Sequence, residues 1–186
     1  MLAKRTTGDW GCYLDSVDKF LHTPKSVIES TESIDFYTHD EHPDECVGKY
    51  AGLRSKDISE IDPVLFKFIT NKFMFWTYGL HPEFFQCKMS CYFSKIQGED
   101  VGTFHRDEQM LRSGVIYLKG SSGTTLYDDS KDIFGRQKKL KEFKFQYNRM
   151  VSYDPNTLHG VSKPDDDRLV IVFFLKEMLA HYTGTH

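Results

Sequence analysis

Apolar residues change their spacing along this chain after Gly79. Before that point the clearest pattern is helical, because the segment EIDPVLFKFITNKF carries one apolar stripe made of Val64, Leu65, Phe68 and Ile69. Asp62 is a suitable cap for this helix, and Pro63 suits its first turn. A weaker pattern in LDSVDKFLH indicates an earlier helix. The first 80 residues therefore predict helices joined by loops.

Short β-rich runs separated by turn residues replace the helical spacing in the rest of the chain. The runs expected to be strands are QCKMSCYFSKI, GVIYLK, TTLYD, LKEFKFQY, RMVSYD and RLVIVFFLK. The last run is apolar on both faces, so we expect a central strand with one face under the helices and the other toward the interior of a barrel. Many short strands at near-regular spacing predict a sandwich or a barrel.

The length of the chain fits one domain spanning residues 1–186. Within it we expect residues 1–80 to form helical support and loops, and residues 81–180 to form the β core. A chain of this size buries about 70% of its unfolded surface, which is enough for a core without covalent staples. The fold class predicted is mostly β with N-terminal helices.

Composition excludes some classes of partner. The formal net charge is -3, so neither a nucleic acid nor an anionic membrane is the expected partner. No apolar run is long enough to span a bilayer, and the first residues lack the apolar core of a signal peptide, which predicts a soluble, cytoplasmic protein. The cysteines contain no CxxC spacing and are expected to be ordinary thiols: Cys12, Cys46, Cys87 and Cys91.

Candidate chemistry begins with the triplet His105-Arg106-Asp107. It follows one predicted strand and precedes another, and residues i and i+2 of an extended backbone project to the same side. Two other triplets of similar form, His42-Pro43-Asp44 and His81-Pro82-Glu83, contain proline and lie outside any strand pattern. Only the first triplet is therefore expected to direct both side chains toward one point.

A third ligand is available further along the chain. His159 follows the predicted strand RMVSYD and a turn at Asp154-Pro155-Asn156. Two histidines and one carboxylate on one face are the ligand set of non-haem Fe(II) oxygenases, which leave the remaining positions open. Arg168 opens the central strand nine residues later, where its guanidinium can bind a carboxylate through two parallel hydrogen bonds.

With these elements in this order, the chain from Cys87 to Lys176 resembles the Fe(II)- and 2-oxoglutarate-dependent oxygenases, in particular the prolyl-4-hydroxylase-like branch. The resemblance also includes Gly98, the VIYL segment and SSGTTLYD. It implies a double-stranded β-helix, that is, a jelly-roll or cupin-like barrel. It further implies that Fe(II) is bound by His105, Asp107 and His159.

The same resemblance implies how 2-oxoglutarate would be held. Arg168 would bind its distal carboxylate, and Tyr117 matches a family tyrosine whose hydroxyl shares that carboxylate. Thr125 and Tyr92 are further expected contacts of this co-substrate. The family tyrosine on the strand before the HxD triplet has no direct match, since Ser94 or Lys95 falls at its position.

The activity implied is hydroxylation of a C-H bond by O2, with 2-oxoglutarate converted to succinate and CO2. Asp107 fills the position that related halogenases leave free for halide, so hydroxylation is the expected outcome. The resemblance implies that the substrate is a peptide side chain, such as prolyl, or a small molecule. Two alternatives stay open: a cupin-like metal-binding barrel with another activity, and a non-catalytic β-sandwich binding module.

Overall fold

The computed structural model describes residues 2–4, 15–43, 50–96, 104–131, 133, 135–161 and 167–181. The helices are α1 Pro24–Ser30, α2 Ile58–Ile61 and α3 Pro63–Tyr78, with 3-10 turns at Thr31–Ser33, His39–Glu41 and Pro82–Phe84. The strands are β1 Leu2–Lys4, β2 Ser16–Val17, β3 Leu53–Arg54, β4 Phe85–Ile96, β5 Arg112–Lys119, β6 Thr124–Lys131, β7 Gln137–Phe143, β8 Met150–Tyr153, β9 Leu158–Gly160 and β10 Arg168–His181.

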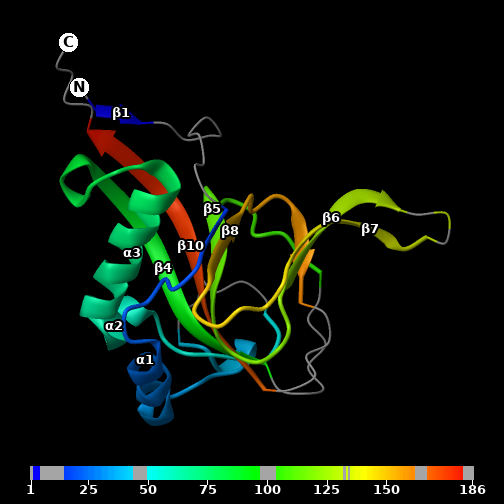
Figure 1. Ribbon diagram of the computed structural model, residues 1–186, viewed down its shortest axis with the longest axis horizontal. Helices are drawn as coiled ribbons and strands as arrows, with labels where there is room; N and C mark the ends of the chain where they lie inside the picture. The colour runs from blue at the N-terminus through cyan, green and yellow to red at the C-terminus, as the bar shows by residue number, and fades with distance from the viewer. Residues whose placement is uncertain are drawn as a thin grey trace.

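Two antiparallel sheets make up the β part of the molecule. The major sheet has the strand order β2-β8-β5-β10-β4-β3, and β1 also pairs with β10. The minor sheet has the order β7-β6-β9. Helix α3 lies along one side of the major sheet, and the β6-β7 hairpin projects from the opposite side of the molecule (Figure 1). The minor sheet therefore faces the side of the major sheet that the helices leave free.

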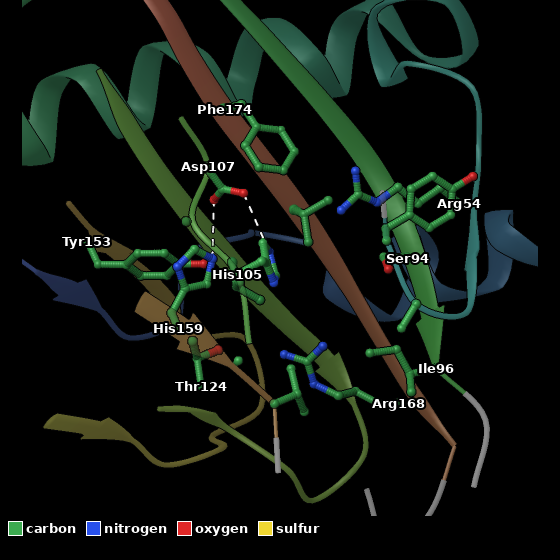
Figure 2. Close-up of a pocket in the computed structure, with 17 residues that line it drawn as sticks. Arg54, Ser94, Ile96, His105, Asp107, Thr124, Tyr153, His159, Arg168 and Phe174 are labelled. Carbon is green, nitrogen blue, oxygen red and sulfur yellow. Dashed lines mark ion pairs between the residues drawn. The ribbon is translucent and has the colours of Figure 1, made fainter. Parts of the chain in front are cut away.

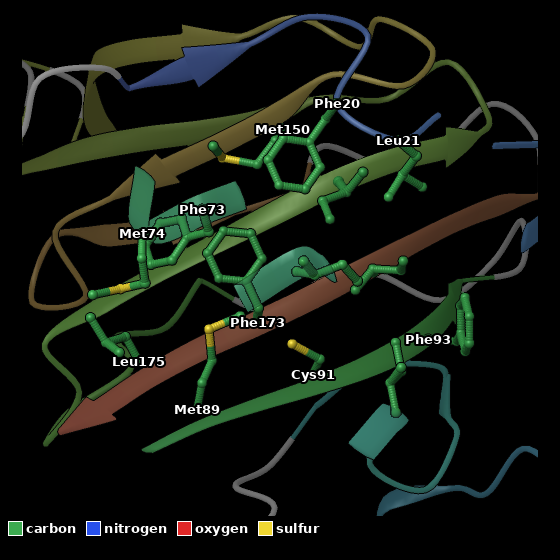
Figure 3. Packing of buried hydrophobic residues seen from close by; sticks show 14 of the residues in the cluster. Phe20, Leu21, Phe73, Met74, Met89, Cys91, Phe93, Met150, Phe173 and Leu175 are labelled. Atoms are coloured by element: carbon green, nitrogen blue, oxygen red, sulfur yellow. The ribbon is translucent and has the colours of Figure 1, made fainter. Parts of the chain in front are cut away.

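Strand β10 is apolar on both faces, as its sequence predicts. It lies between β5 and β4. Ile171 and Phe173 belong to the cluster that packs under the helices, where the rings of Phe173 and Phe73 are 4.8 Å apart between centroids (Figure 3). Val170 and Val172 belong to the other cluster, between the two sheets. The two-residue alternation of a strand separates the helix-covered core from the barrel interior.

The start of α3 is determined by local chemistry, as its sequence predicts. A carboxylate oxygen of Asp62 accepts hydrogen bonds from the backbone N-H groups of Val64 and Leu65, at 3.1 and 2.9 Å. The helix ends at Gly79, which adopts a left-handed backbone with φ of 69°. α3 is thus capped at both ends, which fixes the length of helix available to cover the sheet.

Replacing Asp62 with Ala should destabilise the protein by about 1 kcal/mol, because two backbone N-H groups at the helix start lose their acceptor. The midpoint of urea unfolding measures this. Asp62→Asn should retain most of the stability, since its side-chain oxygen can still accept these bonds. Equal midpoints for wild type and Asp62→Ala would show that the cap contributes nothing.

The prediction of a helix in LDSVDKFLH is wrong. Ser16 and Val17 instead form β2, which pairs with Val151 and Met150 of β8. Lys19 has a positive φ of 53°, which breaks any helical continuation. The segment is held by long-range contacts with the buried residue Asn148, so tertiary pairing overrides a weak local helical tendency. The first helix of the described chain is α1, seven residues long.

The six expected strands are all present, with shifted ends. β7 begins at Gln137 and ends at Phe143, so the last residues of LKEFKFQY lie outside it. The short strands β2, β3 and β9 were not predicted, and they consist of two or three residues each. Such strands are too short to show a two-residue alternation, and they exist because longer strands pair with them.

Cysteine chemistry in the described residues agrees with ordinary thiols. Cys87 is half-buried and Cys91 is buried, and neither forms a disulfide. Burial raises the pKa of Cys87 to about 11 and raises that of Cys91 well above its ordinary value, so both stay protonated. Cys12 and Cys46 lie outside the described residues. None of the described helices combines the length and the apolar character needed to cross a membrane.

Candidate metal centre

The HxD triplet lies in the connection between β4 and β5, close to the start of the minor sheet. His105 forms an isolated antiparallel bridge with His159, in which each backbone N-H donates to the carbonyl oxygen of the other residue at 3.0 Å. The backbone N-H of Asp107 donates to the carbonyl oxygen of Pro155 at 2.9 Å. The side chain of Arg106 instead bonds Asn156 and Asp129. The triplet is therefore held in an extended form against the segment that carries His159.

His159 is positioned by a tight turn and by its own backbone. The turn is closed by a hydrogen bond from the N-H of Thr157 to the carbonyl oxygen of Asp154 at 3.1 Å, and β9 follows directly. The ring atom Nδ1 of His159 lies 2.8 Å from the carbonyl oxygen of Thr157. A carbonyl oxygen can only accept, so Nδ1 carries the proton and Nε2 keeps its lone pair. This tautomer is the one a metal ligand requires.

The three side chains converge on one point. The candidate ligand atoms of His105, Asp107 and His159 all lie within 4.8 Å of one another. Nε2 of His105 is 3.5 Å from one carboxylate oxygen of Asp107, and Nε2 of His159 is 3.3 Å from the other (Figure 2). His159 is buried, whereas His105 and Asp107 are partly exposed. The group therefore has one protected side and one side open to a cavity.

The electrostatics of the site keep the carboxylate ionised. Burial would raise the pKa of Asp107, but the adjacent imidazoles of His105 and His159 outweigh burial and hold this pKa below its ordinary value. The buried ring of Tyr153 lies beside His159, with centroids 4.6 Å apart. Burial, together with the charge of Asp107, raises the pKa of Tyr153 well above its ordinary value, so this tyrosine is neutral.

Arg168 lies at the start of β10 and lines the same cavity as the His-Asp-His group. Its side chain is only 3% exposed. Nε donates to the carbonyl oxygen of Ser122 at 3.1 Å, which orients the guanidinium, and one terminal nitrogen is buried without a partner among the described residues. Burial lowers the pKa of Arg168, but arginine stays charged in proteins. The cavity thus contains a buried cation with an unused donor.

Tyr117 and Thr124 lie beneath this arginine. Tyr117 is fully buried, and its hydroxyl donates to Oγ1 of Thr124 at 2.9 Å. Cζ of Arg168 lies 5.7 Å from the centroid of the Tyr117 ring. Thr124 lines the cavity, and Thr125 does not, because adjacent residues of a strand face opposite sides. Tyr117 is not part of the lining, but its hydroxyl is hydrogen-bonded to Thr124, which is.

Tyr92 lies on β4 but is not part of the cavity lining. Its buried ring packs against Phe174, with centroids 6.4 Å apart, and Cζ of Arg54 lies 5.9 Å from its centroid. Tyr92 therefore packs against two residues of the lining, Arg54 and Phe174. The expected contact of Tyr92 with 2-oxoglutarate stays a prediction.

Arg54 and Tyr153 are among the lining residues that sequence reasoning missed. Arg54 is 9% exposed and comes from the N-terminal part of the chain, where only helical support was expected. It belongs to no motif, so no sequence pattern indicates it. Tyr153 could have been found, because it has the same parity as the inward residue Val151 on β8.

The cavity in front of the triad is open to solvent at its mouth. Apolar side chains from β10 and β4 supply one wall, namely Val172, Phe174 and Ile96. The cavity therefore combines the features of a small-molecule site: mostly apolar walls, two cations and a set of ligand atoms directed to one point.

Comparisons of the fold with known proteins agree with this architecture. The chain is similar to HygX from Streptomyces hygroscopicus, solved with nickel and 2-oxoglutarate bound, at a TM-score of 0.58 and 10% identity over 94% of this chain and 85% of that one. It is similar to a 2OG-Fe(II) oxygenase family oxidoreductase from Burkholderia pseudomallei, at a TM-score of 0.55 and 13% identity, covering 92% and 86%. No family model matches the chain, and no curated protein matches it in sequence.

A third similar structure is a prolyl hydroxylase from Trichoplax adhaerens in complex with a hypoxia inducible factor peptide fragment, at a TM-score of 0.53 and 13% identity, covering 86% and 81%. The chain spans 34% of the length of an oxalate decarboxylase from Lactobacillus farciminis, and that likeness has a TM-score of 0.44. At these identities the comparisons establish the fold. The expected class is confirmed: a mostly β protein with N-terminal helices and the double-stranded β-helix fold of the 2OG-Fe(II) oxygenase structures.

Proposed function

We propose that this protein is an Fe(II)- and 2-oxoglutarate-dependent dioxygenase that hydroxylates a C-H bond of a small molecule or a peptide side chain. The observation that carries the proposal is the presence of one His-Asp-His group and one buried, incompletely paired arginine in the same cavity. The triad alone would suit several metals. The arginine adds a site for the carboxylate of an organic acid beside it.

The donor set fits a ferrous ion. Two neutral imidazoles and one carboxylate on one face are typical of non-haem Fe(II) oxygenases, and His105, Asp107 and His159 would hold the ion. Ferrous iron chelated by 2-oxoglutarate supplies oxidative decarboxylation to succinate and CO2, coupled to insertion of one oxygen atom of O2 into a C-H bond. The partial exposure of His105 and Asp107 leaves the open side that a chelating acid needs.

The chain's own residues would hold and orient the reactants. Arg168 would bind the distal carboxylate of 2-oxoglutarate, with Ser122 fixing the direction of its guanidinium. Thr124, held by the Tyr117 hydroxyl, would offer a second polar contact to the same end of the co-substrate. Phe174 lines the other wall of the cavity and would keep water away from the reacting carbon.

Adding Fe(II) and then 2-oxoglutarate to the protein without oxygen should produce a weak visible charge-transfer band, because only a chelate of both at one centre absorbs there. Admitting air should then release succinate even without added substrate. The band is measured by anaerobic titration and the succinate by chromatography. The Zn(II)-loaded protein is the matched control and should give neither signal.

The rival activities predict other outcomes of this titration. A metal-binding barrel with a different activity would bind Fe(II) but give no band with 2-oxoglutarate. A non-catalytic binding module would bind neither. Either result would overturn the proposal.

A further inference from the structure

Arg54 is the second buried arginine of the cavity, and the proposed reaction does not use it. We infer that Arg54 binds the carboxylate of the primary substrate, and that this substrate is a small carboxylic acid. The inference rests on the proposed function in that the triad and Arg168 are assigned to iron and 2-oxoglutarate. It adds a binding site on the wall formed by β3 and β4 and a chemical class of substrate.

The backbone of Arg54 is fixed from two sides. Within the major sheet it pairs with Ser94 of β4, which also lines the cavity. On its other side it exchanges hydrogen bonds with Tyr37, at 2.8 and 2.9 Å. Residues directly opposite each other in an antiparallel pair project to the same face, so the side chain of Arg54 is directed into the cavity with Ser94.

A nearby glycine permits this close approach of β3 to β4. Gly52 has a positive φ of 74°, and a Cβ atom there would lie 2.2 Å from the carbonyl oxygen of Lys95. Any side chain would push the segment away from β4. The turn before Arg54 is therefore built so that its guanidinium enters the cavity at a fixed place.

Aromatic rings surround the guanidinium but leave its donors free. Cζ of Arg54 lies 4.3 Å from the centroid of the Tyr50 ring and 5.5 Å from that of Phe174. Rings hold a guanidinium by its faces, whereas its five N-H bonds point outward in the plane. Nε is buried without a partner among the described residues, and no described residue accepts a hydrogen bond from this side chain. Stacking alone therefore leaves the donors unsatisfied.

The charge balance of the cavity calls for an anion at this place. Among the described residues, Asp107 is the carboxylate whose charge acts on Arg54, and its two oxygens already lie against His105 and His159. A buried cation without a bonded partner is unfavourable, so a protein that keeps one there gains from an anionic ligand. Figure 2 shows Arg54 and Arg168 extending from different strands toward the His-Asp-His group. Two guanidinium groups, from different strands, thus line one cavity with the candidate metal ligands.

A carboxylate fits this site better than a phosphate. The planar fork of a guanidinium matches a carboxylate through two parallel hydrogen bonds, and the single charge of Arg54 balances one negative charge. A phosphate carries more charge and more acceptors. Among the described residues of the lining, the only other side chains that can carry a positive charge are His105, His159 and Arg168, which the proposed reaction already occupies.

The test uses the twenty L-amino acids as small carboxylic acids, their carboxamides as neutral matches, and inorganic phosphate. Thermal unfolding is followed on protein loaded with Fe(II) and saturating 2-oxoglutarate under anaerobic conditions. At least one acid should raise the unfolding midpoint by about 5 °C at about a hundred times its Kd, and its amide should not. Arg54→Met should weaken binding of that acid at least about 30-fold. Arg54→Lys should restore part of it.

Two further measurements separate the role of Arg54 from the proposed iron and 2-oxoglutarate site. Arg54→Met should keep the visible band with Fe(II) and 2-oxoglutarate, whereas Arg168→Met should lose it. The acid-dependent rise of the unfolding midpoint should also be present in metal-free Arg168→Met protein, where neither iron nor Arg168 contributes. Failure of the proposed oxygenase chemistry would thus leave the Arg54 result readable.

Several outcomes would overturn the assignment. In the first group, no acid raises the midpoint, or phosphate or the amide raises it equally. In the second, Arg54→Met binds the acid as well as wild type, or loses the 2-oxoglutarate band. If Arg54 served only to join β3 to the barrel, Arg54→Met would lower the unfolding midpoint of the ligand-free protein. We expect that midpoint to stay the same or rise, because an unpaired buried charge is removed.

Discussion

Replacing His159 with Ala should remove metal-dependent activity and lower metal affinity by more than about 100-fold, because loss of a residue that merely supports a metal ligand already costs about 10- to 100-fold. His159 is the most buried member of the triad, and its Nε2 lone pair is fixed toward Asp107 by the contact of Nδ1 with Thr157. Neither neighbour can replace this ligand. Calorimetric titration with Fe(II) under anaerobic conditions measures the affinity, and succinate formation measures the activity.

His81→Ala is the matched control for this experiment. His81 begins the triplet His81-Pro82-Glu83, is exposed, and packs its ring against that of Phe75. Its replacement should leave metal affinity and succinate formation unchanged. Circular dichroism checks that His159→Ala is folded. A folded His159→Ala protein that still bound iron with wild-type affinity would show that the triad is not the metal site.

Replacing Arg168 with Met should weaken binding of 2-oxoglutarate by about 30- to 3,000-fold while leaving Fe(II) binding intact. Truncating one partner of a buried, hydrogen-bonded charge pair costs about 2–5 kcal/mol, and each 1.4 kcal/mol is about tenfold in affinity. Arg168 has a buried nitrogen without a partner and a side chain oriented by Ser122. The visible band titrated with 2-oxoglutarate measures the loss.

Arg136→Met controls for the loss of one positive charge, since Arg136 is exposed on the β6-β7 connection. It should bind 2-oxoglutarate like wild type. If Arg168→Met lost iron as well as 2-oxoglutarate, Arg168 would be needed for the metal centre as a whole. If it kept both, another group would hold the acid, and the strongest support for the proposed function would be gone.

The candidate ligands could be predicted because their spacing is local. His105 and Asp107 are two residues apart in extended backbone, so their side chains share a side whatever the rest of the fold does. His159 could be placed with them only through the resemblance and its position after a predicted turn. The structure supplies the reason they meet, a direct backbone bridge between His105 and His159.

The lining of the cavity was less predictable, for two different reasons. Thr124 and Thr125 are adjacent and chemically identical, so only the pairing of β6 with its neighbours determines which faces inward. Arg54 lies far from the triad in sequence, and β3 consists of two residues. Its position depends on pairing with β4 and on the turn at Gly52, neither of which leaves a periodic pattern.

By itself, the sequence determined the type of each long element. The continuous apolar runs of β10 and β5 and the capped apolar stripe of α3 follow from side-chain chemistry within a few residues, which is why they were recognisable. The tertiary structure alone decided which distant segments meet: β2 against β8, and β3 against β4. Those pairings depend on free energies summed over contacts far apart in the chain, and they bring the second arginine into the cavity.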